Sequence, residues 1–355
     1  MQPVAERLRR RIALEGGITI AAYMETVLAG AGGYYRDRDP LGEGGDFITA
    51  PEVSQMFGEL LGLWCIDTWR RLGAPDPVHL VELGPGRGTL MADALRAARV
   101  APDFLAAKQL HLVEINAELR RQQRDRLADH APHWHESLAD LPDGPLLVIA
   151  NEFLDALPVH QFVMTDQGWR ERIVTLREDA LAYGLAAPGA ALALLRPPHK
   201  QARPGAIAET SPAAIALVDS LARRLMAQSG AALFIDYGPA ESGLGDTFQA
   251  LRHHRFHDPL RDPGEADLTA HVDFAALAEA ALQAGAGVFG PVTQGDFLRS
   301  LGLELRSEML AEKADAATAE ILRRQCRRLI APGEMGRLFK VLAVTGANLN
   351  QLAGL

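Results

Sequence analysis

Short apolar runs alternate with helical segments in this sequence, and that rhythm constrains the fold more than any other feature. The first runs are VHLVEL (78–83), LHLVEI (110–115) and PLLVIANEF (145–153). Runs without in–out alternation are typical of strands buried on both faces, and strands separated by helices pair in parallel. We therefore predict an α/β fold with a doubly wound, mostly parallel sheet and right-handed crossovers.

Further elements are expected on both sides of this region. AALFIDYG (231–238) predicts another buried strand, and residues 337–345 predict a last strand that returns to the sheet. Residues 160–186 resemble antiparallel strands with a turn at 166–168. Helices are expected over residues 3–14, 18–29, 52–71, 211–230, 272–284 and, as a longer helical region, 294–330.

Composition excludes several classes of function. The formal charge of −9 argues against nucleic acid as a partner, and four arginines between 323 and 328 are interpreted as a solvated helix face. No apolar run is long enough to span a membrane. Two distant cysteines suit a reducing cytoplasm. The arginine-rich N-terminus resembles a mitochondrial presequence, but Glu6, Glu15 and the lack of serine make the mitochondrial matrix the less favoured location.

The turn after the first apolar run carries glycines at every second position, in the order Glu82-Leu-Gly84-Pro-Gly86-Arg-Gly88. Glycine permits positive φ angles and lets a ligand approach the backbone, and the helix start that follows favours anionic ligand groups. A dinucleotide-binding turn would place its third glycine at the position of Thr89. The pattern therefore disfavours a nicotinamide enzyme, although a glycine-rich turn by itself can be no more than a turn.

A second acid, Glu114, ends the second apolar run, one helix and one strand after the glycines. A carboxylate there can accept hydrogen bonds from both hydroxyl groups of a ribose. Taken alone, Glu114 could be an exposed strand end. The order of strand, glycine turn, helix, strand and acid nevertheless predicts a cofactor site.

The glycine turn and its preceding acid resemble motif I of the S-adenosylmethionine (SAM) methyltransferases. Longer segments are similar to the MidA-type family, bacterial relatives of the mitochondrial complex I assembly factor that methylates a protein arginine. These segments are GDFITAPEVSQMFGELLGLW (45–64), LVELGPGRGTLMADALR (80–96), NEFLDALPVHQF (151–162), ETSPAA (209–214), FIDYG (234–238) and DLTAHVDFAAL (267–277). The resemblance therefore spans most of the chain.

This resemblance implies a class I methyltransferase core, a Rossmann-like sheet of seven strands with an antiparallel last strand. It implies SAM as the cofactor, a protein arginine as the substrate and an NADH:quinone oxidoreductase subunit as the partner. The cofactor residues that it implies are Glu82, Gly84, Gly86, Gly88 and Glu114. Two other functions stay open: a small-molecule methyltransferase, and a non-catalytic assembly factor that keeps SAM binding or only the fold.

We expect four regions along the chain. Residues 1–75 would form a helical section with a lid loop, and residues 76–240 would form the SAM-binding core. Residues 241–330 would form a mainly helical substrate or cap region. Residues 331–355 would provide the final core strand and a tail.

The segment ANEFLDALP follows a buried strand, and ligands in open α/β sheets lie outside the carboxyl ends of the strands. This places Asn151, Glu152 and Asp155 at the crevice as candidate catalytic residues. A guanidinium stays charged and a bidentate carboxylate fixes its plane, so Glu152 is the first candidate to orient a substrate arginine, and Glu209 is the second. The plainer interpretation is that Asn151 caps a helix and Glu152 is solvated.

The segment DFITAPEVSQ predicts a lid over the cofactor. Asp46, Thr49 and Glu52 could reach the amino or carboxylate end of SAM, and we assign Thr49 and Pro51 to the cofactor site. Alternatively, Thr49 and Glu52 form a capping box at a helix start. The two interpretations are compatible.

Histidines gather in HAPHWH (130–135) and HHRFH (253–257). His253 and His257 are four residues apart and could share a helical face, as metal ligands do. Neither group has acids or cysteines that would complete a closed site, and methyl transfer from a sulfonium needs no metal, so no metal is expected. His271 is expected in the cleft or at a helix start.

Overall fold

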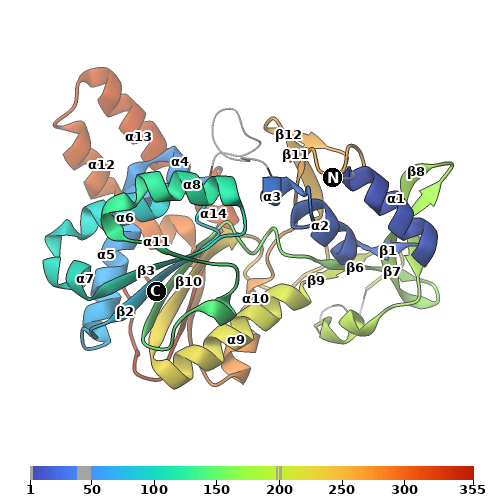
Figure 1. Ribbon diagram of the computed structural model, residues 1–355, viewed down its shortest axis with the longest axis horizontal. Coiled ribbons are helices and arrows are strands. Elements are labelled where there is room, and N and C mark those ends of the chain that lie inside the picture. The colour runs from blue at the N-terminus through green and yellow to red at the C-terminus, as the bar shows by residue number, and fades with distance from the viewer. Residues whose placement is uncertain (1–2, 38–48, 197–198, 200–201) are drawn as a thin grey trace.

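The computed structural model describes residues 3–37, 49–196, 199 and 202–355, which form two lobes lying side by side (Figure 1). The larger lobe contains a seven-stranded sheet with helices on both faces. The smaller lobe contains two further sheets and the first helices of the chain. Among the described residues, every helix is too short or too polar to cross a membrane.

The strands of the large lobe lie in the order β14-β15-β10-β5-β2-β3-β4. Their bounds are Gly287–Thr293 (β14), Phe339–Thr345 (β15), Gly230–Tyr237 (β10), Leu146–Asn151 (β5), Val78–Leu83 (β2), Lys108–Val113 (β3) and His133–His135 (β4). The strands from β10 to β4 run parallel, and β15 is antiparallel to both of its neighbours. The predicted doubly wound, mostly parallel sheet with an antiparallel last strand is confirmed.

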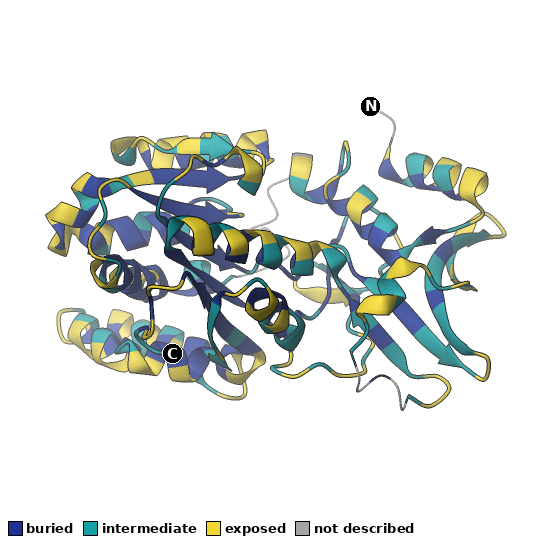
Figure 2. Cartoon of the chain, turned by 90° about the horizontal axis from the view of Figure 1, so that it is seen from below, coloured by how far each residue is buried: buried dark blue, intermediate teal, exposed yellow. Residues whose placement is uncertain are grey.

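The central strands are apolar along their length because helices cover both of their faces. Leu80 and Ile149 belong to the core on one face, and Val81 and Phe234 belong to the core on the other. The first face carries α5 (Gln55–Arg71), α6 (Thr89–Ala97), α7 (Pro102–Ala107), α11 (Gln294–Ser300) and α13 (Ala316–Ile330), and the second carries α9 (Pro212–Gln228) and α10 (Phe274–Gln283). The lobe also contains α8 (Ala117–Arg126), α12 (Leu303–Ala311) and α14 (Met335–Leu338). Figure 2 shows the buried strands between helices whose outer surfaces are exposed.

The small lobe joins three distant parts of the chain. They are α1 (Val4–Glu15), β1 (Ile18–Thr19), α2 (Ile20–Leu28) and α3 (Tyr34–Asp37), then β6 (His160–Thr165), β7 (Gly168–Arg177), β8 (Ala180–Ala186) and β9 (Ile207–Thr210), and finally β11 (Gln249–Arg252), β12 (Arg255–His257) and β13 (Asp267–Thr269). One sheet has the order β1-β7-β6-β9 with β8 added to β7, and the other has the order β12-β11-β13. Tyr23, Val174, Phe248 and Leu268 share its core.

This division differs from the four regions expected along the chain. The expected cap region, residues 241–330, is not mainly helical throughout. Before α10 it contains β11 to β13, which form a sheet in the small lobe, and after α10 it contributes β14 to the central sheet. The N-terminal section is also divided, since α1 and α2 pack in the small lobe whereas α5 packs in the large one. Strands of three or four residues give no periodic signal, so the sequence did not reveal that β11 to β13 belong to the small lobe.

Three predicted helices have different bounds. The helix expected over 18–29 starts with the short strand β1, and the helix expected over 52–71 is interrupted at Ser54, where the backbone is extended. This break separates α4 (Ala50–Val53) from α5. Ser211 caps α9 as predicted, accepting a hydrogen bond from Ala214 N (3.2 Å), but Gly230 begins β10 and does not close the helix.

Glu59 of α5 connects three helices of the large lobe. Its carboxylate accepts hydrogen bonds from Arg96 of α6 (3.0 Å) and from Arg306 of α12 (2.8 Å). Burial alone would raise the pKa of Glu59, but the hydrogen bonds from the two arginines outweigh it and hold the pKa below its ordinary value. Such a carboxyl group stabilises the fold above its unfolded pKa, and this stability is lost as the pH falls through the lower folded pKa.

We expect Glu59→Gln to lower the free energy of unfolding at pH 7 by about 1–2 kcal/mol, because the two arginines lose a charged partner. The difference from the wild type should shrink as the pH is lowered from about 5 toward about 3. Urea denaturation across this range measures both effects. Glu308→Gln, which removes the exposed pair with Arg323, is the matched control, and a Glu59→Gln deficit that is unchanged at the lowest pH would contradict the prediction.

Candidate active site

A cavity of about 520 Å³ lies where the carboxyl ends of β2, β3 and β5 face the small lobe. Its lining includes the glycine turn after β2, the residues that follow β3 and β5, and residues of α2, α3, α4 and β13. Doubly wound sheets bind their ligands in this crevice. We refer to it as the active-site cavity.

The glycine turn requires glycine for its backbone shape. Gly84, Gly86 and Gly88 have φ angles of 63°, 52° and 76°, which other residues rarely adopt. A Cβ atom on Gly84 would lie 2.8 Å from the ring of Phe153. Gly84 and Gly86 line the cavity, whereas Gly88 is the N-cap of α6 and faces Gln123. The contribution of Gly88 is therefore to shape the turn.

Gln123 of α8 connects the glycine turn to Glu114. Its amide nitrogen donates to Gly86 O (2.6 Å) and to Glu114 Oε2 (3.3 Å), and its amide oxygen accepts from Trp134 Nε1 (2.8 Å). Glu114 Oε1 accepts a further hydrogen bond from Asn116 N (2.8 Å). Gln123 could not be predicted from the sequence, because α8 is largely polar and nothing in its pattern marks this residue as buried.

Glu82 is buried at the end of β2 beneath the turn. Its Oε2 atom has no hydrogen-bond partner among the described residues, and burial, followed by the charge of Glu114, raises its pKa to about 8. A ligand with a cationic donor would stabilise a buried acid in this condition. The turn and its two flanking acids thus fit SAM, which has a ribose for Glu114 and an amino group for Glu82.

Acidic side chains dominate the active-site cavity. Eight carboxylic acids line it, and Arg87 is the single basic residue among the described lining residues. The acids are Glu25, Glu52, Glu82, Glu114, Glu136, Glu152, Asp155 and Asp267. This excess of negative charge favours positively charged ligands.

Asn151, Glu152 and Asp155 all line the cavity at the end of β5, where the strand-end rule predicts them. Glu152 has a φ of 49°, and its Oε1 atom accepts hydrogen bonds from Ala50 N of α4 (2.8 Å) and from Asn151 Nδ2 (3.2 Å). Burial raises the pKa of Glu152 to about 7. The alternative in which Asn151 caps a helix is wrong, because a loop follows β5.

Asp155, Asp267 and Tyr35 form an acidic cluster on the side of the cavity nearest the small lobe. The Tyr35 hydroxyl donates to Asp267 Oδ2 (2.8 Å). Burial, followed by the charges of Asp267 and Asp155, raises the pKa of Tyr35 well above its ordinary value, and burial raises that of Asp155 to about 6. Asp267 begins the segment DLTAHVDFAAL, but the sequence did not identify it as a site residue, because the pairing of β13 with β11 brings it to the cavity.

Asp236, the acid of FIDYG, holds the loop after β5 in place. Its Oδ2 atom accepts hydrogen bonds from the backbone nitrogens of Phe153 (3.1 Å), Leu154 (2.9 Å) and Asp155 (3.2 Å). Three donors on one oxygen fix the direction of each side chain in this loop. Asp236 is thus a positioning residue, a role that the FIDYG motif alone did not indicate.

The lid segment contributes Thr49, Pro51 and Glu52 to the cavity lining. The capping box is not formed, because the Thr49 side chain makes no capping hydrogen bond. Glu52 instead accepts a hydrogen bond from the Thr89 hydroxyl (2.7 Å), beside the glycine turn. Asp46 lies outside the described residues.

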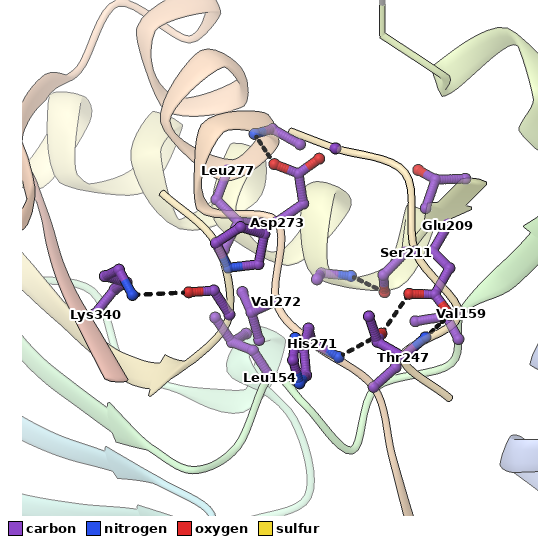
Figure 3. A pocket seen from close by; sticks show the side chains of 18 of the residues that line it. Leu154, Val159, Glu209, Ser211, Thr247, His271, Val272, Asp273, Leu277 and Lys340 are labelled. Atoms are coloured by element: carbon purple, nitrogen blue, oxygen red, sulfur yellow. Dashed lines mark hydrogen bonds between the residues drawn. The ribbon is translucent and has the colours of Figure 1, made fainter. Parts of the chain in front are cut away.

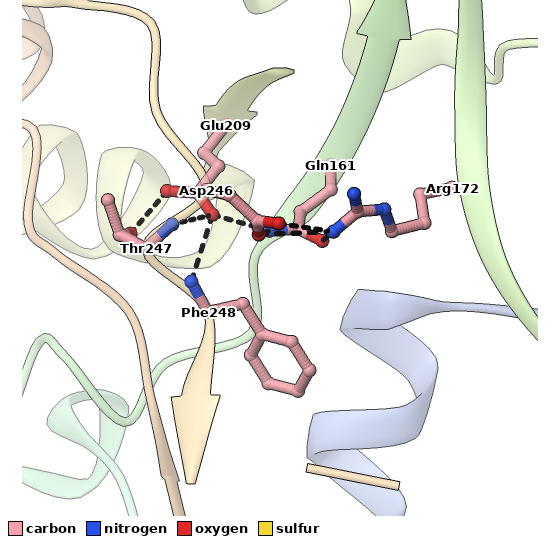
Figure 4. A network of polar contacts seen from close by, with 6 residues as sticks. All are labelled: Gln161, Arg172, Glu209, Asp246, Thr247 and Phe248. Atoms are coloured by element: carbon pink, nitrogen blue, oxygen red, sulfur yellow. Dashed lines mark hydrogen bonds and ion pairs between the residues drawn. The ribbon is translucent and has the colours of Figure 1, made fainter. Parts of the chain in front are cut away.

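Glu209 lines a second cavity (Figure 3), whereas the other catalytic candidates line the active-site cavity. Its Oε1 atom accepts hydrogen bonds from Gln161 Nε2 (2.6 Å), Thr247 N (3.0 Å) and Phe248 N (3.1 Å), and its Oε2 atom accepts from the Thr247 hydroxyl (Figure 4). Both carboxylate oxygens are therefore engaged within the protein. Glu209 therefore lines a different cavity from Glu152, and its role as the second candidate to orient a substrate arginine stays a prediction.

The HAPHWH histidines belong to strand β4 and to a buried chain of rings. His79 Nε2 lies 3.0 Å from Asp143 O, His79 Nδ1 lies 3.0 Å from His111 Nε2, and His111 Nδ1 lies 3.0 Å from His135 Nε2. A carbonyl can only accept, so each ring donates through Nε2, and His79 and His111 accept through Nδ1. Burial and the neighbouring rings lower the pKa of His111 to about 3, which keeps the His111 ring neutral.

The other histidines also lie apart from any metal centre. His253 is in the turn between β11 and β12 and His257 is in β12, so the expected shared helical face is wrong. His271 lines the second cavity. No group of three or more potential ligands in the described part of the chain is arranged to hold a metal ion.

Comparison with known proteins agrees with this geometry. A family model described as "Putative S-adenosyl-L-methionine-dependent methyltransferase" matches residues 60–292. Mitochondrial proteins named protein arginine methyltransferase NDUFAF7 are similar over 96% of this chain: the Drosophila melanogaster homolog is 39% identical over 84% of its own length, and the human protein is 38% identical over 83%. A Burkholderia thailandensis protein bound to S-adenosyl-homocysteine matches 99% of this chain and 94% of its own, with a TM-score of 0.85 and 31% identity.

We expect Gly86→Val to weaken SAM binding by at least about 100-fold, because a branched side chain at positive φ must reshape the turn or enter the cofactor's path. Isothermal titration calorimetry measures the affinity. Gly168→Val is the matched control, because Gly168 also has a positive φ (96°) but no atom lies within 4 Å of its added Cβ. Unchanged SAM binding by Gly86→Val would show that this turn is not the cofactor site.

Proposed function

Because this chain belongs to the family of S-adenosyl-L-methionine-dependent methyltransferases, we propose that it methylates arginine side chains of a protein substrate. SAM is the cofactor, and the acidity of the active-site cavity is the observation that carries the choice of substrate. SAM carries a sulfonium, and arginine carries a guanidinium that stays protonated. Eight carboxylic acids against one arginine suit a site that holds both cations. The names of the animal relatives support the same substrate class.

We assign the cofactor to the side of the cavity formed by β2 and β3. The backbone of Gly84 and Gly86 holds it, Glu114 binds the ribose hydroxyls, and Glu82 faces its amino group. Thr49 and Pro51 cover it from the lid segment. When bound, SAM supplies an electrophilic methyl group on a positively charged sulfur.

In this proposal, the substrate guanidinium is bound by Glu152, Asp155 and Asp267. Carboxylates on more than one side of a guanidinium fix its plane, so that one nitrogen points toward the cofactor. The nitrogen that receives the methyl group must then lose a proton. Glu152 can accept it, because burial raises its pKa to about 7.

We extend the proposal to the partner and the compartment. The resemblance to the complex I assembly factor supports an NADH:quinone oxidoreductase subunit as the substrate protein. Cys65 and Cys326 are both free thiols in the structure, which suits a reducing compartment such as the cytoplasm.

Transfer of labelled methyl groups from SAM in a lysate that lacks this protein tests the function. We expect label in arginine side chains of a protein, and in a complex I subunit if the partner is correct. SAM binding with no labelled protein would contradict the proposal and favour a non-catalytic assembly role. Label recovered in a small molecule would favour a small-molecule methyltransferase.

We expect Glu152→Gln and Asp267→Asn each to lower kcat/KM by about 100-fold or more, because each removes a charged hydrogen-bond acceptor from the guanidinium. The Kd for SAM should change by less than about threefold, since neither residue is assigned to the cofactor. Methyl-transfer kinetics and calorimetry measure the two effects. Asp219→Asn, on the exposed surface of α9, is the control, and full activity in both test variants would contradict the assignment.

The pH profile gives an independent test of Glu152. Because its pKa is raised to about 7, it is largely protonated at lower pH and ionised at higher pH. Only the ionised form can hold a guanidinium, so kcat/KM should increase as the pH rises through about 7. A profile recorded between about pH 6 and 8 should lose this increase in Glu152→Gln, and an identical increase in the variant would exclude Glu152 as its source.

A further inference from the structure

The second cavity (Figure 3) has a volume of about 560 Å³ and is adjacent to the active-site cavity. The loop after β5 separates the two, because Leu154 and Val159 line the second cavity whereas Asp155 lines the active site. The start of α9 is shared in the same way, with Ala213 on the active-site side and Ala214 on the other. At the loop after β5, the two cavities are therefore separated by a single chain segment.

The acidic groups around the second cavity are engaged by the protein itself. Glu209 accepts four hydrogen bonds through its two oxygens. Asp273 accepts from Ala276 N (3.0 Å) and from the Ser242 hydroxyl (2.8 Å), and it caps α10. These carboxylates have their hydrogen bonds in place and do not require a ligand.

The Lys340 ammonium and the Ser211 hydroxyl in the lining are engaged as well. Lys340 Nζ donates to the backbone oxygens of Gly238 (3.0 Å), Arg337 (2.6 Å) and Leu338 (3.1 Å). The Ser211 hydroxyl donates to Pro158 O (2.9 Å) while accepting from Ala214 N. A ligand would have to break these contacts before it could bind Lys340 or Ser211. Arg337 also lines the cavity, and its charge disfavours a basic ligand.

Apolar side chains make up most of the remaining surface. They include Leu154, Val159, Ile215, Val272 and Leu277, contributed by the β5 loop, α9 and α10. Leu244 belongs to the same lining and is 46% exposed. An exposed leucine at the edge of an apolar cavity gains stability when an apolar group covers it.

We propose that the second cavity binds a large apolar side chain of the protein substrate, located at a fixed position near the methylated arginine. This inference rests on the proposed function, since the arginine would occupy the adjacent active site. Because a single chain segment separates the two cavities, the two side chains that occupy them would come from nearby positions of one bound chain. The apolar lining favours an apolar residue, and the cations Lys340 and Arg337 disfavour a basic one. The second cavity is thus a specificity pocket of the same enzyme.

A peptide library tests the pocket. Glycine-rich peptides carry a central arginine and one phenylalanine, which is moved through each position on either side. Their binding is measured by fluorescence anisotropy in the presence of S-adenosyl-homocysteine, and their methylation is measured with SAM. We expect one phenylalanine position to bind at least about tenfold more tightly than the phenylalanine-free peptide, because a buried aromatic side chain supplies that gain.

Ala276→Trp fills the second cavity from α10 and should abolish this preference, so that peptides with and without phenylalanine bind about equally. Ala216→Trp is the matched control, because Ala216 lies on the exposed surface of α9, and it should keep the preference. The Kd for SAM reports that both variants are folded. A library without a preferred position, or a preference unaltered by Ala276→Trp, would overturn the pocket assignment.

The two measurements separate this inference from the proposed function. Arginine methylation without any preferred phenylalanine position would overturn the pocket and leave the function intact. A preferred position in the binding measurement, with no methylation of any arginine peptide, would support the pocket and overturn the function.

Discussion

One oxygen of Asp236 accepts three backbone hydrogen bonds from the loop after β5, and both cavities depend on this contact. The contact binds the loop to the end of β10, so consecutive side chains point in opposite directions. Leu154 faces the second cavity, and Asp155 faces the active site. Without Asp236, three buried N–H groups would lack partners, and the acids at the end of β5 would lose their fixed directions.

Burial in the active-site cavity explains why its acids have raised pKa values. Burial is the largest cause for Glu82, Glu114, Glu152 and Asp155 alike. Carboxylic acids gathered in one cavity repel each other when ionised, and cationic ligands relieve that repulsion. Binding of a cation must therefore lower these pKa values and release protons, as linkage requires. Charge, more than contact area, determines which ligands this cavity accepts.

The sequence predicted the features that depend on local pattern. The strands β2, β3, β5 and β10 are continuous apolar runs, and the Gly84–Gly88 turn and Glu114 follow from spacing. The sequence did not predict β4, whose three residues His-Trp-His have no strand signal, or Gln123 and Asp267, whose roles arise from contacts between distant segments. Glu209 was the second candidate to orient a substrate arginine, and the structure adds that its carboxylate accepts hydrogen bonds from the segment that begins at Thr247.

Tyr35 joins the cofactor side of the site to the substrate side. Its backbone oxygen accepts from Asn116 Nδ2 (2.7 Å), and Asn116 N donates to Glu114, the acid at the end of β3. Its hydroxyl donates to Asp267 in the small lobe. A single residue thus links the acid assigned to the ribose with an acid assigned to the guanidinium. Because the contact between Asn116 and Tyr35 crosses between the lobes, a movement that separated the lobes there would break the link between the two binding sites.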